Sequence, residues 1–270
     1  MGRGEDAGAA APGAEEAEFE QSGPPVVVVN AEGRSPFVLL CEHASRLLPA
    51  GYGRLGLPAA EFDRHIAWDI GAAEVATRLA CLVDAPLFLA GYSRLLIDLN
   101  RPPGSRTSIP EISEATVIPG NASLDGAERR RRRELWFEPF HRAVAAHLDG
   151  RGSRRTAVLG IHSFTPVFAG VARPWQAGVL FRESAAFAEA LAQALEVRLG
   201  SPVGRNEPYR VALDHDYTVP VHGDARGFPA TLIEIRQDLV CDVFAIERWS
   251  RIVAASLRAI EHLVESSPTP

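Results

Sequence analysis

The chain of 270 residues is 46% hydrophobic and 23% charged, values typical of a globular protein with enough material for a sizeable core. Its formal net charge of −6 argues against a nucleic-acid partner. The sequence contains no lysine, which excludes Schiff-base chemistry and a P-loop, and its three separated cysteines argue against a disulfide framework.

The first 24 residues are rich in Gly, Ala, Glu and Pro, and they predict a disordered tail over 1–24. They lack the pattern of a secretory signal, and no apolar run in the chain reaches the ~18 residues of a membrane span. We therefore expect a cytoplasmic protein without a membrane partner, folded over residues 25–267.

Apolar runs and helical periodicity alternate along the rest of the chain. We expect strands at 36–41, 156–162, 177–181 and 230–235, two strands within 86–100 broken near 91–93, and helices at 59–83, 124–148, 183–199 and 241–265. This alternation predicts a single α/β domain with a mostly parallel, mixed sheet flanked by helices.

Three of the predicted strands end in groups suited to metal or acid–base chemistry. The first ends in Glu42 and His43, the second ends in His162, and the third places Glu234 and Arg236 on one side. Burying a charged group costs several kcal/mol unless it is paired or metal-bound. Because ligands bind at the carboxyl ends of parallel strands, we expect these groups to converge there.

Two histidines and one carboxylate form the usual ligand set of a catalytic zinc site with an open position. His43 and His162 supply the imidazoles, and either Asp69 or Glu42 supplies the carboxylate. Asp69 and His65 are four residues apart and would share a face of the predicted helix. The alternative interpretation is a pair of structural histidines with a buried ion pair. The metal hypothesis fails if the two imidazoles lie beyond reach of a common centre.

The segment "YSRLLIDLNRPPG" (92–104) carries polar groups within an apolar stretch. Arginine guanidinium groups bind carboxylates through paired hydrogen bonds, so Arg94 and Arg101 suit an acidic substrate, with Asn100 as an amide donor. An internal ion pair between Arg94 and Asp98 is the alternative for those two residues.

Four segments together resemble the N-formylglutamate amidohydrolase family. They are "CEHAS", "DRHIAWDIGA", "YSRLLIDLNRP" and "IEIRQDL", and the resemblance extends over roughly residues 36–260. It implies a zinc-carboxypeptidase-like (phosphorylase/hydrolase-like) α/β fold. It also implies a zinc-dependent hydrolase that cleaves linear amide bonds in amino-acid metabolism.

The resemblance implies metal ligation by His43 and His162. The H-x-x-E spacing of carboxypeptidase-like sites is absent, because Arg46 stands three residues after His43. The resemblance offers Asp69, the family's aspartate in the "HIAWD" block, as the substitute third ligand, with Glu42 in reserve. Zn²⁺ is the expected cofactor, although a His/His/carboxylate set also accepts Mn, Co or Fe.

The resemblance also implies roles around the metal. Glu234 resembles the glutamate that activates water, and Asn100 with Arg101 resembles the pair that holds a substrate carboxylate. Arg94 and Arg236 are further candidates for substrate binding. His222, in "VPVHGDARG", would line the pocket or donate to the oxyanion, unless it is a solvated loop residue.

The implied substrate is a small acidic N-acyl amino acid or peptide, of which N-formyl-L-glutamate is the leading example. One alternative is a deacylase or peptidase that acts on a different substrate at the same zinc site. Another is a non-catalytic small-molecule-binding protein that has kept the fold.

Overall fold

Seven strands of the chain form one sheet in the order β12-β11-β13-β8-β3-β5-β2, within the residues 20–265 that the computed structural model describes. The strands are β2 (Val26–Val29), β3 (Phe37–Cys41), β5 (Leu87–Ala90), β8 (Ala157–Phe164), β11 (Ala177–Leu180), β12 (Gly204–Arg205) and β13 (Ala230–Arg236). The central strands β13, β8, β3 and β5 are parallel, whereas β11 and β2 run antiparallel to their inner neighbours. The predicted mostly parallel, mixed sheet is confirmed.

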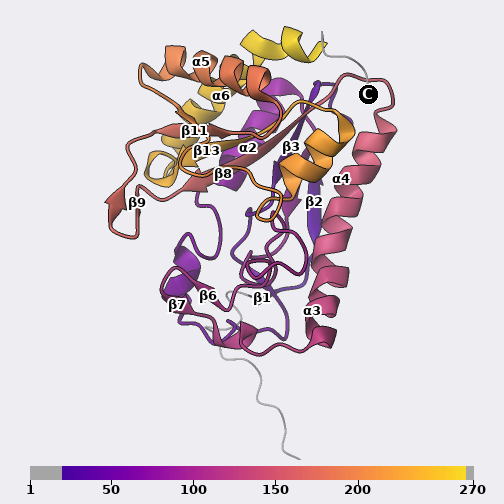
Figure 1. The fold of residues 1–270 in the computed structure, drawn as a ribbon, viewed down its shortest axis with the longest axis vertical. Helices are drawn as coiled ribbons and strands as arrows, with labels where there is room; N and C mark the ends of the chain where they lie inside the picture. The colour runs from indigo at the N-terminus through magenta and orange to yellow at the C-terminus, as the bar shows by residue number, and fades with distance from the viewer. Residues whose placement is uncertain (1–19, 266–270) are drawn as a thin grey trace, which may run out of the picture.

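Helices cover both faces of the sheet. On one face, α2 (Ala72–Val83) and α5 (Ala185–Leu199) pack against α6 (Val243–Glu265). On the other face lies α4 (Glu138–Gly150), which α3 (Gly126–Arg132) precedes through a π-helical turn at Arg133–Phe137. Figure 1 shows α3 and α4 in line along one side of the molecule, with α5 and α6 at its upper end.

Side chains of the central strands alternate between two apolar cores, one on each face. In β8, Leu159 and Ile161 belong to the core under α2, α5 and α6, whereas Val158 belongs to the core on the α4 side. Because successive side chains of a strand point to opposite faces, His162 lies on the α4 side with Val158. The same alternation places Glu234 of β13 on that side.

The predicted helix over 59–83 is wrong in its first half. Ala59–Asp63 is a 3-10 turn, the chain from 64 to 71 is a loop, and α2 begins only at Ala72. Gly71 has a φ of 77°, which an α-helix cannot contain, and a Cβ there would lie 2.4 Å from the carbonyl oxygen of Val240. Asp69 and His65 therefore do not share a helix face.

The predicted second strand within 86–100 is also wrong. The chain leaves the sheet after β5, because the N–H of Ser93 donates to the carbonyl of Leu47 at 2.8 Å and that of Leu96 donates to Ser93 at 3.0 Å. Residues 91–100 consequently form a series of turns. These turns allow Arg94 and Asp98 to form an ion pair with each other.

Part of the predicted tail is ordered. Residues 1–19 lie outside the described residues, but β1 (Glu20–Gln21) pairs in parallel with β4 (Leu48–Pro49). The hydroxyl of Tyr92 donates to the carbonyl oxygen of Gly23 at 2.7 Å. The last residues of the predicted tail, 20–24, therefore contact the folded domain. None of the described helices is long and apolar enough to span a membrane.

Candidate active site

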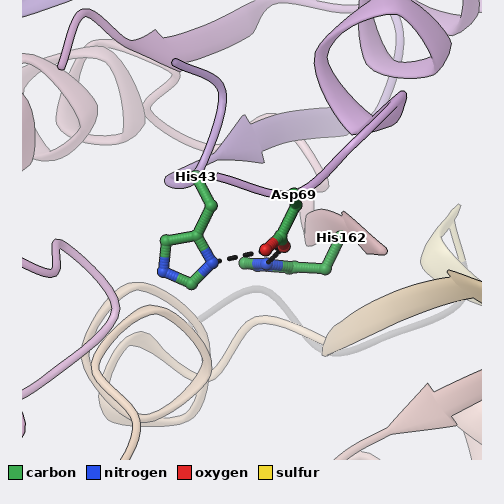
Figure 2. Close-up of side chains that lie close together, drawn as sticks. All are labelled: His43, Asp69 and His162. Carbon is green, nitrogen blue, oxygen red and sulfur yellow. Dashed lines mark hydrogen bonds and ion pairs between the residues drawn. The ribbon is translucent and has the colours of Figure 1, made fainter. Parts of the chain in front are cut away.

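Three buried side chains meet at the carboxyl edge of the sheet. Nδ1 of His43 lies 3.2 Å from Oδ2 of Asp69, and Nδ1 of His162 lies 2.8 Å from the same oxygen. Figure 2 shows the Asp69 carboxylate reached by both imidazoles. Ligand atoms of all three residues lie within 4.8 Å of one another, so together they could hold a metal ion. The two imidazoles are therefore close enough to reach one common metal ion, as the metal hypothesis requires.

The other ring nitrogen of each histidine faces a second carboxylate. Nε2 of His43 lies 2.8 Å from Oδ1 of Asp98, and Nε2 of His162 lies 3.1 Å from Oε2 of Glu42, although this second contact is not aligned as a hydrogen bond. Glu42 therefore faces the opposite ring nitrogen of His162 from Asp69. Carboxylates in this position orient a ligating imidazole and fix its tautomer.

Backbone contacts explain why Asp69 reaches the site from a loop. Its own N–H donates to the carbonyl oxygen of His43 at 3.0 Å, which attaches the loop to the end of β3. The N–H of Ser163 donates to Oδ2 of Asp69 at 3.3 Å, and Nη1 of Arg94 lies 3.4 Å from Oδ1. The carboxylate is thus held in place by three separate parts of the chain.

The electrostatics of the cluster favour a cation among its carboxylates. Burial raises the pKa of Asp69, but His43 and His162 outweigh it and hold this pKa well below its usual range. Burial likewise opposes ionisation of Glu42, yet His162 and Thr218 lower the pKa of Glu42 to about 2. Both carboxyl groups are therefore ionised at neutral pH, as metal coordination requires.

Glu234 stands beside this cluster, and no described residue bonds to its carboxylate. It is opposite His162 in the parallel pairing of β13 with β8, and it is 6% exposed. Its Oε2 is buried and has no hydrogen-bond partner within the described chain. Burial, reinforced by the charge of Asp69, raises the pKa of Glu234 to about 7. A carboxyl group with this pKa can both accept and return a proton at neutral pH.

A cavity of about 300 Å³ opens onto these groups. Its lining includes the three clustered residues and Glu234, together with three arginines. The arginines are Arg94, Arg101 and Arg210. The cavity therefore combines acid–base groups with cations that suit an acidic ligand.

The structure binds Arg94 and Arg101 largely to acceptors of the chain itself. Nη2 of Arg94 lies 2.6 Å from Asp98, so the alternative of an internal ion pair is what the structure contains. Nη1 of Arg101 donates to the carbonyl oxygen of His215 at 2.6 Å and lies 3.4 Å from Asp216. Both arginines line the cavity, but part of each guanidinium is already engaged.

Asn100 also lines the cavity, and it connects two loops. The side-chain oxygen Oδ1 of Asn100 accepts hydrogen bonds from the backbone N–H groups of Tyr217 and Thr218 at 3.2 and 3.0 Å. Its amide nitrogen donates to Asp216 at 3.3 Å. The second amide N–H of Asn100 has no acceptor among the described residues.

His222 and Arg236 are absent from the cavity lining. His222 is 2% exposed, and its Nε2 lies 2.9 Å from Nδ1 of His141, whose own Nε2 donates to the carbonyl of Leu99. It is thus neither a pocket residue nor a solvated loop residue. The side chain of Arg236 bonds to Asp238, and its Nε donates to the carboxylate at 2.8 Å.

The cavity lining also includes three residues that were not predicted from the sequence, Tyr209, Arg210 and Asp216. They belong to a loop after β12 that has no hydrophobic periodicity, so no local pattern marks them. The loop is positioned by its contact with β11, where Glu207 passes so close that a Cβ on Gly178 would lie 1.9 Å from its carbonyl oxygen.

An unpaired acid beside two imidazoles, at the carboxyl edge of a mostly parallel sheet, is typical of the hydrolase class of α/β enzymes. The chain belongs to the N-formylglutamate amidohydrolase family, whose sequence profile matches residues 35–241. The family resemblance noted from the four sequence segments is confirmed.

Two solved structures match the fold over most of this chain. Gene product Atu2144 from Agrobacterium tumefaciens is 36% identical with a TM-score of 0.83, covering 88% of this chain and 97% of that one. N-formylglutamate amidohydrolase from Ralstonia eutropha JMP134 has the same fold, with 19% identity, a TM-score of 0.62 and coverage of 89% and 98%. A comparison with curated proteins gives no match.

Proposed function

We propose that this hydrolase is a metal-dependent amidase that cleaves the C–N bond of a small N-formyl or N-acyl amino acid bearing a carboxylate. N-formyl-L-glutamate is the first substrate to test. The observation that carries the proposal is Glu234, a buried acid with no bonding partner in the described part of the chain, in the same cavity as the His43–Asp69–His162 cluster. Membership of the amidohydrolase family supports it.

The donor set of the cluster fits a divalent transition metal, and zinc is the expected ion. The ligands would be Nδ1 of His43, Nδ1 of His162 and the Asp69 carboxylate, while Asp98 bonds the far ring nitrogen of His43 and Glu42 faces that of His162. A divalent ion bound by such ligands supplies Lewis-acid polarisation of the carbonyl and lowers the pKa of water.

Glu234 performs the proton transfers of the proposed reaction. Its carboxylate accepts a proton from the water that attacks the acyl carbon, and the resulting carboxylic acid returns that proton to the amine nitrogen as the C–N bond breaks. A pKa of about 7 suits both steps at neutral pH, because neither protonation state is strongly disfavoured.

The size of the cavity favours a small substrate. At about 300 Å³ it lies at the lower end of the range for ligand sites, which extends to roughly 1,000 Å³. A short N-acyl amino acid fits this volume better than an extended peptide. The arginines of the lining favour an acidic substrate, because guanidinium groups bind carboxylates.

One experiment tests metal, substrate class and catalysis together. The purified protein is analysed for bound metals and assayed with N-formyl-L-glutamate, N-acetyl-L-glutamate, N-formyl-L-leucine and a γ-glutamyl peptide, before and after treatment with a chelator. We expect about one equivalent of metal, hydrolysis that is fastest with N-formyl-L-glutamate, and loss of activity that zinc restores. A deacylase or peptidase would prefer another member of the panel. Binding without turnover of any compound would identify a non-catalytic relic.

A further inference from the structure

A buried arginine next to the cavity has no carboxylate partner among residues 20–265. Arg173 follows the β9–β10 hairpin (Val167–Phe168 and Val171–Ala172) and is 9% exposed. Its guanidinium carbon lies 4.6 Å from the ring centre of Phe168 and 4.7 Å from that of Tyr209. Within the described chain, its side chain has hydrogen-bond partners only in Thr165 and Tyr209. Burying a charge without an ion-pair partner costs free energy, so we expect Arg173 to have a function at this position.

The contact between Arg173 and Tyr209 leaves a hydrogen-bond donor at the cavity. Nη1 of Arg173 donates to the Tyr209 hydroxyl at 2.9 Å, so the oxygen serves as acceptor and its own proton is available. Tyr209 lines the cavity, and the charge of Glu234 contributes to the raised pKa of the phenol. Burial, the largest cause, and this carboxylate keep the phenol in its neutral form, in which it donates.

Arg210 adds a cation to the lining of the same cavity. It lines the cavity and is exposed, and no ion pair or hydrogen bond to its side chain occurs within residues 20–265. Arg94 and Arg101, by contrast, are partly engaged by Asp98 and by the carbonyl of His215. Of the three arginines in the lining, Arg210 therefore has the guanidinium most available to a ligand.

We propose that Tyr209 and Arg210 form a subsite that binds the side-chain carboxylate of a dicarboxylic N-acyl amino acid, with Arg173 as the positioning residue for Tyr209. This inference rests on the proposed function and specifies how the acidic side chain is recognised. The remaining donors of Arg101 and Asn100 then serve the other carboxylate. A carboxylate held by a hydroxyl and a guanidinium gains charge-assisted hydrogen bonds that a neutral amide side chain does not.

The test compares N-formyl-L-glutamate with N-formyl-L-glutamine, which have nearly the same shape but differ in side-chain charge. In Arg210→Gln and Tyr209→Phe, we expect the preference for glutamate in kcat/KM to fall by about 10- to 100-fold, mainly through KM. Arg106→Gln, an exposed arginine outside this cavity, is the matched control and should leave both rates unchanged.

The role of Arg173 is tested by combining its substitution with that of Tyr209 in a double-mutant cycle. Arg173→Gln should reduce the same preference, and it should have no further effect on the preference in the Tyr209→Phe background. Arg173→Lys, which keeps the charge, should restore part of it. A residue that only stabilises the fold would lower both rates equally and leave the preference unchanged, which would overturn the positioning role.

Product binding separates this inference from the proposed function. L-glutamate and L-glutamine are titrated calorimetrically into the metal-containing protein and into the Arg210→Gln variant. Selective binding of L-glutamate that depends on Arg210 supports the subsite even if no substrate is hydrolysed, in which case the proposed amidase activity alone is wrong. If wild type hydrolyses both substrates and the Arg210 and Tyr209 variants keep its preference, the subsite is wrong and the amidase stands.

Discussion

Glu234 of β13 lies directly opposite His162 of β8 in a parallel pairing that continues from Ala230–Val158 to Arg236–Phe164. Because parallel neighbours in register project their side chains to the same face, the acid and the imidazole stand side by side over the cavity. Gly160 precedes His162 on this face, and a Cβ there would lie 3.3 Å from Nε2 of His162. The sheet itself therefore sets the distance between the proposed proton-transfer group and the proposed ligand.

Replacement of Glu234 by glutamine should remove catalysis and keep the metal. We expect kcat to fall by ~10² or more, the usual scale for loss of a general base, with an unchanged metal content. Steady-state kinetics and elemental analysis check both parts. Glu134→Gln changes an exposed acid on the π-helical turn and serves as the control. Turnover at the wild-type rate in the Glu234 variant would exclude this residue from the mechanism.

The two carboxylates near His162 should behave differently on substitution. Asp69→Asn removes a proposed ligand and should abolish stable metal binding. Glu42→Gln removes a group that orients His162, so we expect metal affinity to fall by about 10- to 100-fold while the stoichiometry remains one. Competition titration with a chromophoric chelator measures both effects. The opposite ranking would exchange the roles of the two residues.

Acid should destabilise the protein through the buried pair His141 and His222. Burial is the main cause that lowers their pKa values to about 3 and about 4. An unfolded histidine binds a proton below about pH 6.5, whereas these folded ones do not until pH falls much further, so stability is lost as pH falls. The expected loss is roughly 2 kcal/mol per histidine between neutral pH and about pH 5.

Urea unfolding of the metal-free protein at the two pH values measures this loss. In His222→Gln the difference in unfolding free energy between the two conditions should shrink by about the contribution of one histidine. His262→Gln, at an exposed position of α6, should keep the full wild-type difference. An equal difference in all three proteins would show that the buried pair does not cause the acid sensitivity.

Gly71 should be sensitive to the addition of a single methyl group. Its φ of 77° alone costs a residue with a Cβ about 1–3 kcal/mol, and the contact with the carbonyl of Val240 adds to this. We expect Gly71→Ala to lower the free energy of unfolding by at least that amount, because the loop that carries Asp69 must shift. Gly150→Ala, where a Cβ meets nothing within 4 Å, should stay within ~1 kcal/mol of wild type in chemical denaturation.

Regular elements were the most predictable part of this molecule. The strands β3, β8, β11 and β13 and the helices α5 and α6 coincide with their predicted ranges within a few residues. Their hydrophobic periodicity is a local property, and Gly200, with a φ of 65°, ends α5 where expected. The predictions of a helix over 59–71 and of a strand within 91–100 are wrong for the same reason. In both segments the backbone bonds to distant parts of the chain and does not continue a regular helix or strand.

The sequence by itself determined the apolar strands, the histidines and acids at their carboxyl ends, and hence the edge of the sheet at which a site forms. These follow from alternation and from the cost of burying unpaired charge, which are readable residue by residue. Only the tertiary structure decided that Asp69 shares the Nδ1 side of both imidazoles while Glu42 faces the other side of His162. It also decided that Arg94 is paired with Asp98, whereas the Arg210 side chain has no partner within residues 20–265. These outcomes depend on distances between residues far apart in the chain, which packing of the loops on the sheet establishes.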